Sequence, residues 1–149
     1  MQNHRILFFV VIGALGPVYA NPVSPERCTR IQKAAAGANY ARSQAELPGK
    51  DQVWQFKPDG ELAASGVADF GKKPGTTGRW QFQHEDGTCV LKVAWFAKKD
   101  HWLTYHLVDV TWAIVTLPKD ERHIPDFADH TGGKFRFCGI ENQCRPAVK

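Results

Sequence analysis

The run from Pro118 to Gly133 gathers several side chains that could do chemistry. Within it lie two histidines and two aspartates, His123, Asp126, Asp129 and His130. Imidazole and carboxylate groups can bind a divalent cation, but the spacing here matches no recognised metal pattern. The run predicts a polar loop, for which a solvated loop is the simplest interpretation. Because loops of this length are often functional, a loop that contacts a protein partner is the functional alternative. The predicted contact residues are His123, Asp126, Phe127, Asp129 and His130.

The rest of the sequence carries no recognisable catalytic pattern. His101 and His106 are five residues apart, so an unbroken strand would place them on opposite faces. The Gly-x-Ser-x-Gly turn of serine hydrolases is absent. We therefore expect a binding protein rather than an enzyme, and no cofactor. A small hydrolase or metal-dependent enzyme that uses residues 118–133 is an alternative.

Five tryptophans are many for a chain of 149 residues. Large rings favour strands and fill cores, which is the simplest explanation for them. Residues 88–97, however, are largely apolar at both sets of alternate positions. The two sets are Val90, Ala94 and Phe96, and Leu91, Val93 and Trp95. Only one of these two faces can pack in the core. The other apolar face must be covered by another part of the sheet, by a protein partner or by a ligand. An apolar ligand inside a barrel would be lined by Trp80, Trp95, Trp102 and Trp112.

Four cysteines predict two disulfides, because an even number in an oxidising compartment normally pairs. The favoured pairing joins Cys138 to Cys144 across a short polar loop, which leaves Cys28 to bond Cys89. Pairings of Cys89 with Cys138 or with Cys144 stay open. Zinc binding by the cysteines is disfavoured because the sequence has no Cys-x-x-Cys pair.

The first twenty residues have the three parts of a secretory signal. Arg5 precedes the apolar run Ile6 to Leu15, and Val18-Tyr19-Ala20 offers the cleavage site. A bilayer core of about 30 Å needs roughly 20 apolar residues, so the run is too short to span it. We predict cleavage after Ala20, and a secreted or periplasmic protein of residues 21–149 that forms one domain without a membrane span.

Two kinds of secondary structure follow the signal. Ser24-Pro25-Glu26 predicts a helix start, and apolar residues at three- and four-residue steps extend the predicted helix from Arg27 to Glu46. Leu47-Pro48-Gly49 should end it. Alternating patterns and turn signals then predict about six or seven antiparallel strands. The predicted strands include 53–57, 61–70, 79–84, 88–97, 101–117 and 134–138.

The spacing Trp54-x-Phe56-x-x-Asp59-Gly60, with a later Gly78-x-Trp80, resembles that of lipocalin-like barrels and small periplasmic inhibitor proteins. The resemblance covers part of the chain and implies a fold rather than a site. The predicted fold class is α+β, mainly β. It has one N-terminal helix, then an antiparallel meander that forms a curved sheet or a small lipocalin-like barrel with two disulfides.

Composition and charge limit the classes of function that the sequence allows. A hydrophobic content of 43% and a charged content of 23% fit one compact domain. The formal charge of +4 is dispersed, with no basic stripe for nucleic acid. We expect an exported binding protein that acts on a macromolecular partner in the envelope or outside the cell, such as an inhibitor or immunity protein against a hydrolase. The alternative is a carrier of a small apolar ligand in a tryptophan-lined barrel.

Overall fold

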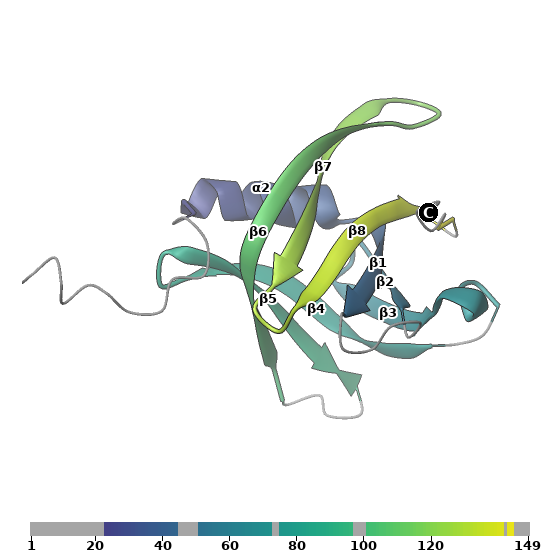
Figure 1. The fold of residues 1–149 in the computed structure, drawn as a ribbon, viewed down its shortest axis with the longest axis horizontal. Coiled ribbons are helices and arrows are strands. Elements are labelled where there is room, and N and C mark those ends of the chain that lie inside the picture. Colours follow the sequence, from purple (N-terminus) through teal and green to yellow (C-terminus); the bar gives the residue numbers. More distant parts are fainter. Residues whose placement is uncertain (1–22, 45–50, 73–74, 97–100, 142, 145–149) are drawn as a thin grey trace, which may run out of the picture.

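Eight antiparallel strands form a closed barrel in chain order, and the last strand pairs with the first (Figure 1). The computed structural model describes residues 23–44, 51–72, 75–96, 101–141 and 143–144, so the predicted signal segment lies outside the described residues. The strands are β1 (Ala38–Gln44), β2 (Gln52–Phe56), β3 (Glu61–Gly66), β4 (Thr76–Glu85), β5 (Thr88–Trp95), β6 (Leu103–Thr116), β7 (Glu121–Asp129) and β8 (Gly133–Ile140). A short 3-10 helix, η1 (Val67–Asp69), follows β3. The barrel is therefore of the predicted kind, with more strands than predicted.

Helix α2 (Pro25–Ala35) begins where the sequence predicts, with the Ser24 hydroxyl capping its first turn. Its predicted end at Glu46 is wrong. Gly37 has a φ of +86°, a conformation that glycine adopts readily, and it ends the helical segment. Ala38 and Ala41, which follow it, belong to β1. No helix among the described residues is long and apolar enough to cross a membrane.

Residues 118–133, predicted as a loop, are mostly strand. They contain all of β7 and the turn between β7 and β8. Strands β6 and β7 form a long hairpin that projects beyond the barrel body in Figure 1. Strand β7 pairs with β8 only at Phe127 and Ala128, so Pro125 lies where β7 has no β8 partner. Proline, which lacks an N–H, is tolerated in a strand at such an edge.

Side chains bridge the places where strands separate. The Gln32 side-chain oxygen of α2 accepts the backbone N–H of Phe82 in β4 at 2.7 Å. Asp126 of β7 accepts the backbone N–H of Phe137 in β8 at 2.8 Å. Helix α2 packs against β4 and β7. The helix therefore closes the end of the barrel at which β2, β4 and β6 finish.

Aromatic rings fill the barrel interior next to α2. Phe56 makes edge-to-face contacts with Trp80 and Tyr40, with ring centroids 5.0 and 5.4 Å apart. The inward face of α2 adds Cys28, Ile31 and Ala35 to this core. Aromatic pairs in these geometries add about 0.5–1.5 kcal/mol each beyond their buried area. The helix end of the barrel is thus a packed core.

Both favoured disulfides are confirmed. Cys28 of α2 bonds Cys89 of β5, and Cys138 bonds Cys144 beyond the end of β8. The first ties the helix to the barrel wall across 61 positions of sequence, whereas the second closes a local turn. Disulfides form and persist in oxidising compartments, so both bonds suit a protein that leaves the cytosol.

Replacing Tyr40 with phenylalanine should change how stability depends on alkaline pH. The buried Tyr40 hydroxyl donates to the Pro125 carbonyl at 2.7 Å. Burial, and then the negative charge of Asp126, raise the pKa of Tyr40 above its ordinary value near 10. Above that value the unfolded chain loses the proton first, so folding stability should fall by up to about 1.4 kcal/mol per pH unit.

Urea midpoints of wild type and Tyr40→Phe from about pH 8 to pH 11 measure this effect. The variant should start about 1–2 kcal/mol less stable, because the Pro125 carbonyl loses its donor. Its stability should then fall less steeply with pH, so the two curves converge. Parallel curves would contradict the assignment to Tyr40.

Candidate functional site

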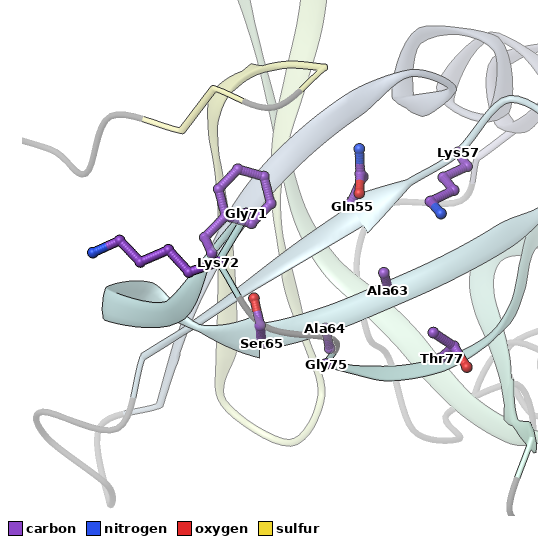
Figure 2. A pocket seen from close by; sticks show the side chains of 10 residues that line it. Gln55, Lys57, Ala63, Ala64, Ser65, Gly71, Lys72, Gly75 and Thr77 are labelled. Atoms are coloured by element: carbon purple, nitrogen blue, oxygen red, sulfur yellow. The ribbon is translucent and has the colours of Figure 1, made fainter.

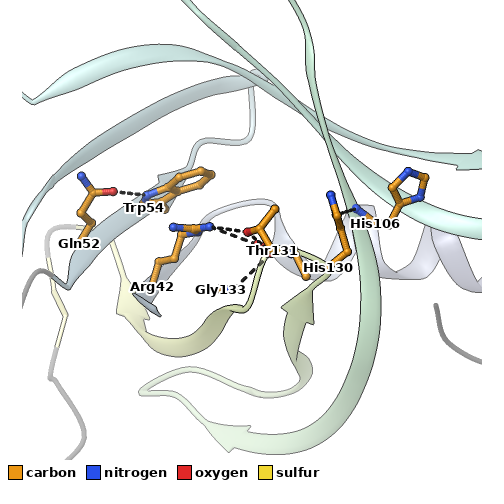
Figure 3. Close-up of polar contacts among 8 residues, drawn as sticks. Arg42, Gln52, Trp54, His106, His130, Thr131 and Gly133 are labelled. Carbon is orange, nitrogen blue, oxygen red and sulfur yellow. Dashed lines mark hydrogen bonds and ion pairs between the residues drawn. The ribbon is translucent and has the colours of Figure 1, made fainter. Parts of the chain in front are cut away.

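Strand β7 does not bring the predicted contact residues of 118–133 to one point. His123 is exposed near its start, whereas Asp129 is buried at its end and His130 follows in the turn. Phe127 is a core residue. The backbone N–H of His106 donates to Nδ1 of His130 at 3.0 Å, a contact drawn in Figure 3. The described residues contain no cluster of three or more potential metal ligands.

The tryptophans predicted to line a ligand space lie in different environments. Trp80 is buried near α2, and Trp95 packs edge-on against Trp54 with centroids 5.3 Å apart. Trp112 lies under Arg30 of the helix. Trp102 is 39% exposed and lies under Arg79, whose position on β4 points outward. A single lining formed by all four rings is therefore not present, although Trp95 does point inward.

A polar pocket lies on the outer wall of the barrel, over β2, β3 and β4 (Figure 2). Its volume is about 360 Å³, within the usual range for small-molecule sites. Residues on the three strands form its floor, and the segment after η1 forms its rim. The lining comprises Gln55, Lys57, Ala63, Ala64, Ser65, Phe70, Gly71, Lys72, Gly75 and Thr77.

A buried arginine lies at the other end of the barrel from α2, inside the mouth formed where β1, β3, β5 and β7 finish. Arg42 of β1 points inward, and its side chain is only 10% exposed. The guanidinium carbon lies 5.3 Å from the ring centres of Trp54 and Phe135, and 5.6 Å from that of Tyr105. A cation over aromatic faces is attracted by their negative charge. We call Arg42, Trp54, Tyr105, Phe135 and Asp129 the mouth cluster.

Asp129 holds both the arginine and the β7–β8 turn. One carboxylate oxygen accepts the backbone N–H groups of Thr131 and Gly133 at 2.8 and 3.2 Å, and also the Thr131 hydroxyl. The other oxygen lies 3.3 Å from Nη2 of Arg42. Figure 3 shows Arg42 directed at this turn. The Asp129 side chain is fully buried, and a buried carboxylate requires such partners.

The turn leaves no room for a side chain at Gly133. A Cβ there would overlap both Nη2 of Arg42 and the carboxylate of Asp129. A side chain at this position would therefore displace the ion pair. The mouth cluster is a tightly fitted site rather than a chance contact of long side chains.

These contacts do not use all of the N–H groups of Arg42. Its side-chain hydrogen bonds to Asp129 and Thr131 are both donated by Nη2. Its Nε is buried without a hydrogen-bond partner among the described residues. Burial raises the pKa of Tyr105, while Arg42 lowers it and Asp129 raises it further. The mouth cluster is thus poorly hydrated and contains an unsatisfied cationic N–H group.

Sequence reasoning missed Arg42 because it placed residues 38–44 in a helix. Gly37 before an alternating Ala38, Tyr40, Arg42 series could have predicted a strand with these side chains on one face. The pairing of Arg42 with Asp129 had no local signal, since barrel closure brings them together.

Comparisons of the chain with protein-family models, with curated proteins and with solved structures each find no significant match. Its function must therefore be inferred from the geometry of its own residues.

Proposed function

We propose that this chain is an exported binding protein whose barrel mouth holds a small organic anion with an aromatic or apolar body. The observation that carries the proposal is the nine-tenths buried Arg42, whose Nε has no partner among the described residues. Leaving a buried charged donor unpaired is unfavourable by at least about 1–3 kcal/mol. A carboxylate, sulfate or sulfonate oxygen would satisfy that donor.

The neighbours of Arg42 suit the rest of such a ligand. Trp54 and Phe135 are buried, while Trp95 and Tyr105 remain partly exposed toward the mouth. Rings supply apolar contact for a ligand body, and a few polar groups fix its orientation. The oxygens of Asp129 are already engaged by the turn and by Nη2 of Arg42, which leaves Nε of Arg42 as the donor that a ligand would use.

Two fluorescent probes with the same ring system test the charge requirement. One is 8-anilinonaphthalene-1-sulfonate, and the other is its uncharged parent N-phenyl-1-naphthylamine. Wild type should bind the sulfonate about ten-fold or more tightly than the uncharged probe, because charge-assisted hydrogen bonds contribute about 1.5–3 kcal/mol. Arg42→Met should lose this preference.

Arg79→Met is the matched control, because Arg79 also lies over a tryptophan, Trp102, but on the outer wall. It should retain the preference. Arg42→Lys keeps the charge if the methionine variant is too unstable, and it should retain part of the preference. Equal sulfonate affinity in wild type, Arg42→Met and Arg79→Met would refute the proposal.

A second candidate function is binding of a protein partner through the β6–β7 hairpin, as expected for an inhibitor. The hairpin extends away from the barrel body in Figure 1, and Ile114 on it is 65% exposed. A rigid exposed arm is a suitable element for entering a cleft of another protein. Exposed apolar side chains at its tip would provide the anchor.

Capture from an envelope extract compares wild type with Ile114→Glu and Phe96→Glu. Phe96 is the control, because it is also an exposed apolar residue at 45% but lies on the barrel wall after β5. A protein retained by wild type and Phe96→Glu but lost with Ile114→Glu would support binding through the hairpin. Identical capture by all three proteins would exclude it.

A further inference from the structure

We infer that the polar pocket on the outer wall is a second binding site, independent of the mouth, for an acidic saccharide unit: a sugar ring that carries a carboxylate, sulfate or phosphate group. The pocket is walled by three barrel strands and the segment after η1, and its volume is about 360 Å³. Such a hollow on the outer wall is separate from the aromatic interior of the barrel.

The charge of the lining indicates an anionic ligand. Lys57 and Lys72 line the pocket, and no aspartate or glutamate does. Lys57 is half-buried, and no hydrogen bond or ion pair joins its ammonium to another described residue. In Figure 2 the Lys72 side chain extends away from the other lining groups, whereas Lys57 stays beside them. Lys57 is therefore the residue that would meet the acidic group.

The remaining lining groups suit a sugar rather than a bare anion. Figure 2 places the Gln55 amide and the Ser65 hydroxyl between the two lysines, and Thr77 adds a hydroxyl on the β4 side of the pocket. These groups can donate to or accept from ring hydroxyls. Phe70 adds an apolar ring at the rim. A bare phosphate or sulfate would need donors converging on one point, whereas these are spread along the pocket.

Small residues form part of the pocket lining. A Cβ at Gly75 would overlap the backbone carbonyl oxygen of Ala64, so glycine is required where β4 approaches β3. Ala63 contributes only a methyl group to the floor. The Gln55 amide is held in place, because its nitrogen donates to the Glu141 carbonyl at 3.1 Å. Its side-chain oxygen stays available as an acceptor.

The test titrates the full-length mature protein with a hexuronate-containing disaccharide, with its neutral hexose counterpart and with inorganic sulfate, followed by amide NMR shifts. The acidic disaccharide should shift the resonances of Gln55, Ser65 and Thr77, and should bind about ten-fold or more tightly than the neutral one. Lys57→Gln should remove that difference. Phe70→Ala should weaken both sugars.

Lys33→Gln is the control, because Lys33 is an exposed lysine on α2. It should leave both affinities unchanged. Equal binding of acidic and neutral sugars by wild type, or no shift with either, would overturn the inference. Sulfate binding as tight as that of the disaccharide would show a simple anion site and would overturn it too. None of these outcomes depends on Arg42, so failure here leaves the mouth proposal intact.

Discussion

Replacing Asp129 with alanine is expected to lower the free energy of unfolding by about 3–5 kcal/mol, because it removes one partner of a buried ion pair. Arg42 would keep its charge in a site that is nine-tenths buried and surrounded by rings. The backbone N–H groups of Thr131 and Gly133 would lose their acceptor as well. Urea unfolding, followed by tryptophan fluorescence, measures the change.

Two further variants separate the charge from the hydrogen bonds. Asp129→Asn keeps an oxygen for the turn and should be less damaging than Asp129→Ala. The double variant Arg42→Met with Asp129→Leu should recover much of the loss, since apolar replacements for a buried pair are often close to neutral. Asp126→Ala is the control, because that aspartate accepts a single backbone N–H. If Asp126→Ala and Asp129→Ala lowered the free energy of unfolding equally, the ion pair of Asp129 with Arg42 would not be a major source of stability.

Removing the disulfide between Cys28 and Cys89, by changing both residues to serine, should lower the free energy of unfolding by about 4 kcal/mol. The bond spans 61 positions of sequence, and a longer closed loop restricts the unfolded chain more strongly. It also holds the inner face of α2 on the barrel, where both sulfurs are buried. Urea midpoints of the oxidised proteins measure the difference.

Changing Cys138 and Cys144 to serine is the matched control. That bond spans only 6 positions, and the same chain-entropy estimate gives about 2 kcal/mol. The larger loss should therefore belong to the pair with the longer loop. The reverse order would show that local packing around the C-terminal turn outweighs the restriction of the unfolded chain.

The antiparallel β class and the Cys138–Cys144 disulfide could be predicted from sequence because their signals are local. The Cys28–Cys89 disulfide followed only as the remaining pair, since its cysteines are 61 positions apart. Turn residues such as Asp86-Gly87 lie between alternating strands, and the Ser24 cap marks a helix start. The sequence favours a helix over residues 38–44 because alanine is the strongest helix former. In the structure their pairing with β2 and β8 overrides that propensity. Residues 121–129 looked like a loop because charged groups and Pro125 mask the alternation of an edge strand.

The mouth cluster could not be predicted for a different reason. Arg42 and Asp129 are 87 positions apart, and they meet only because the barrel closes. The histidines and aspartates of 118–133 were chosen for their chemistry, yet a strand spreads side chains along its length at about 3.3 Å per residue. Of that set, Asp129 does belong to the mouth cluster, where it holds Arg42 and the turn.

The pairing of the first strand with the last also governs how the protein can be made. Ala38 through Gln44 must wait for Gly133 through Ile140 to be synthesised before they have a hydrogen-bonding neighbour on that side. Until then the nascent polypeptide presents an unsatisfied edge and a Tyr40 ring without its Phe135 and Phe137 neighbours. Such non-local topology slows maturation and invites association between immature copies. Barrel closure therefore has to be a late step, taken only once residues 133–140 are available to β1.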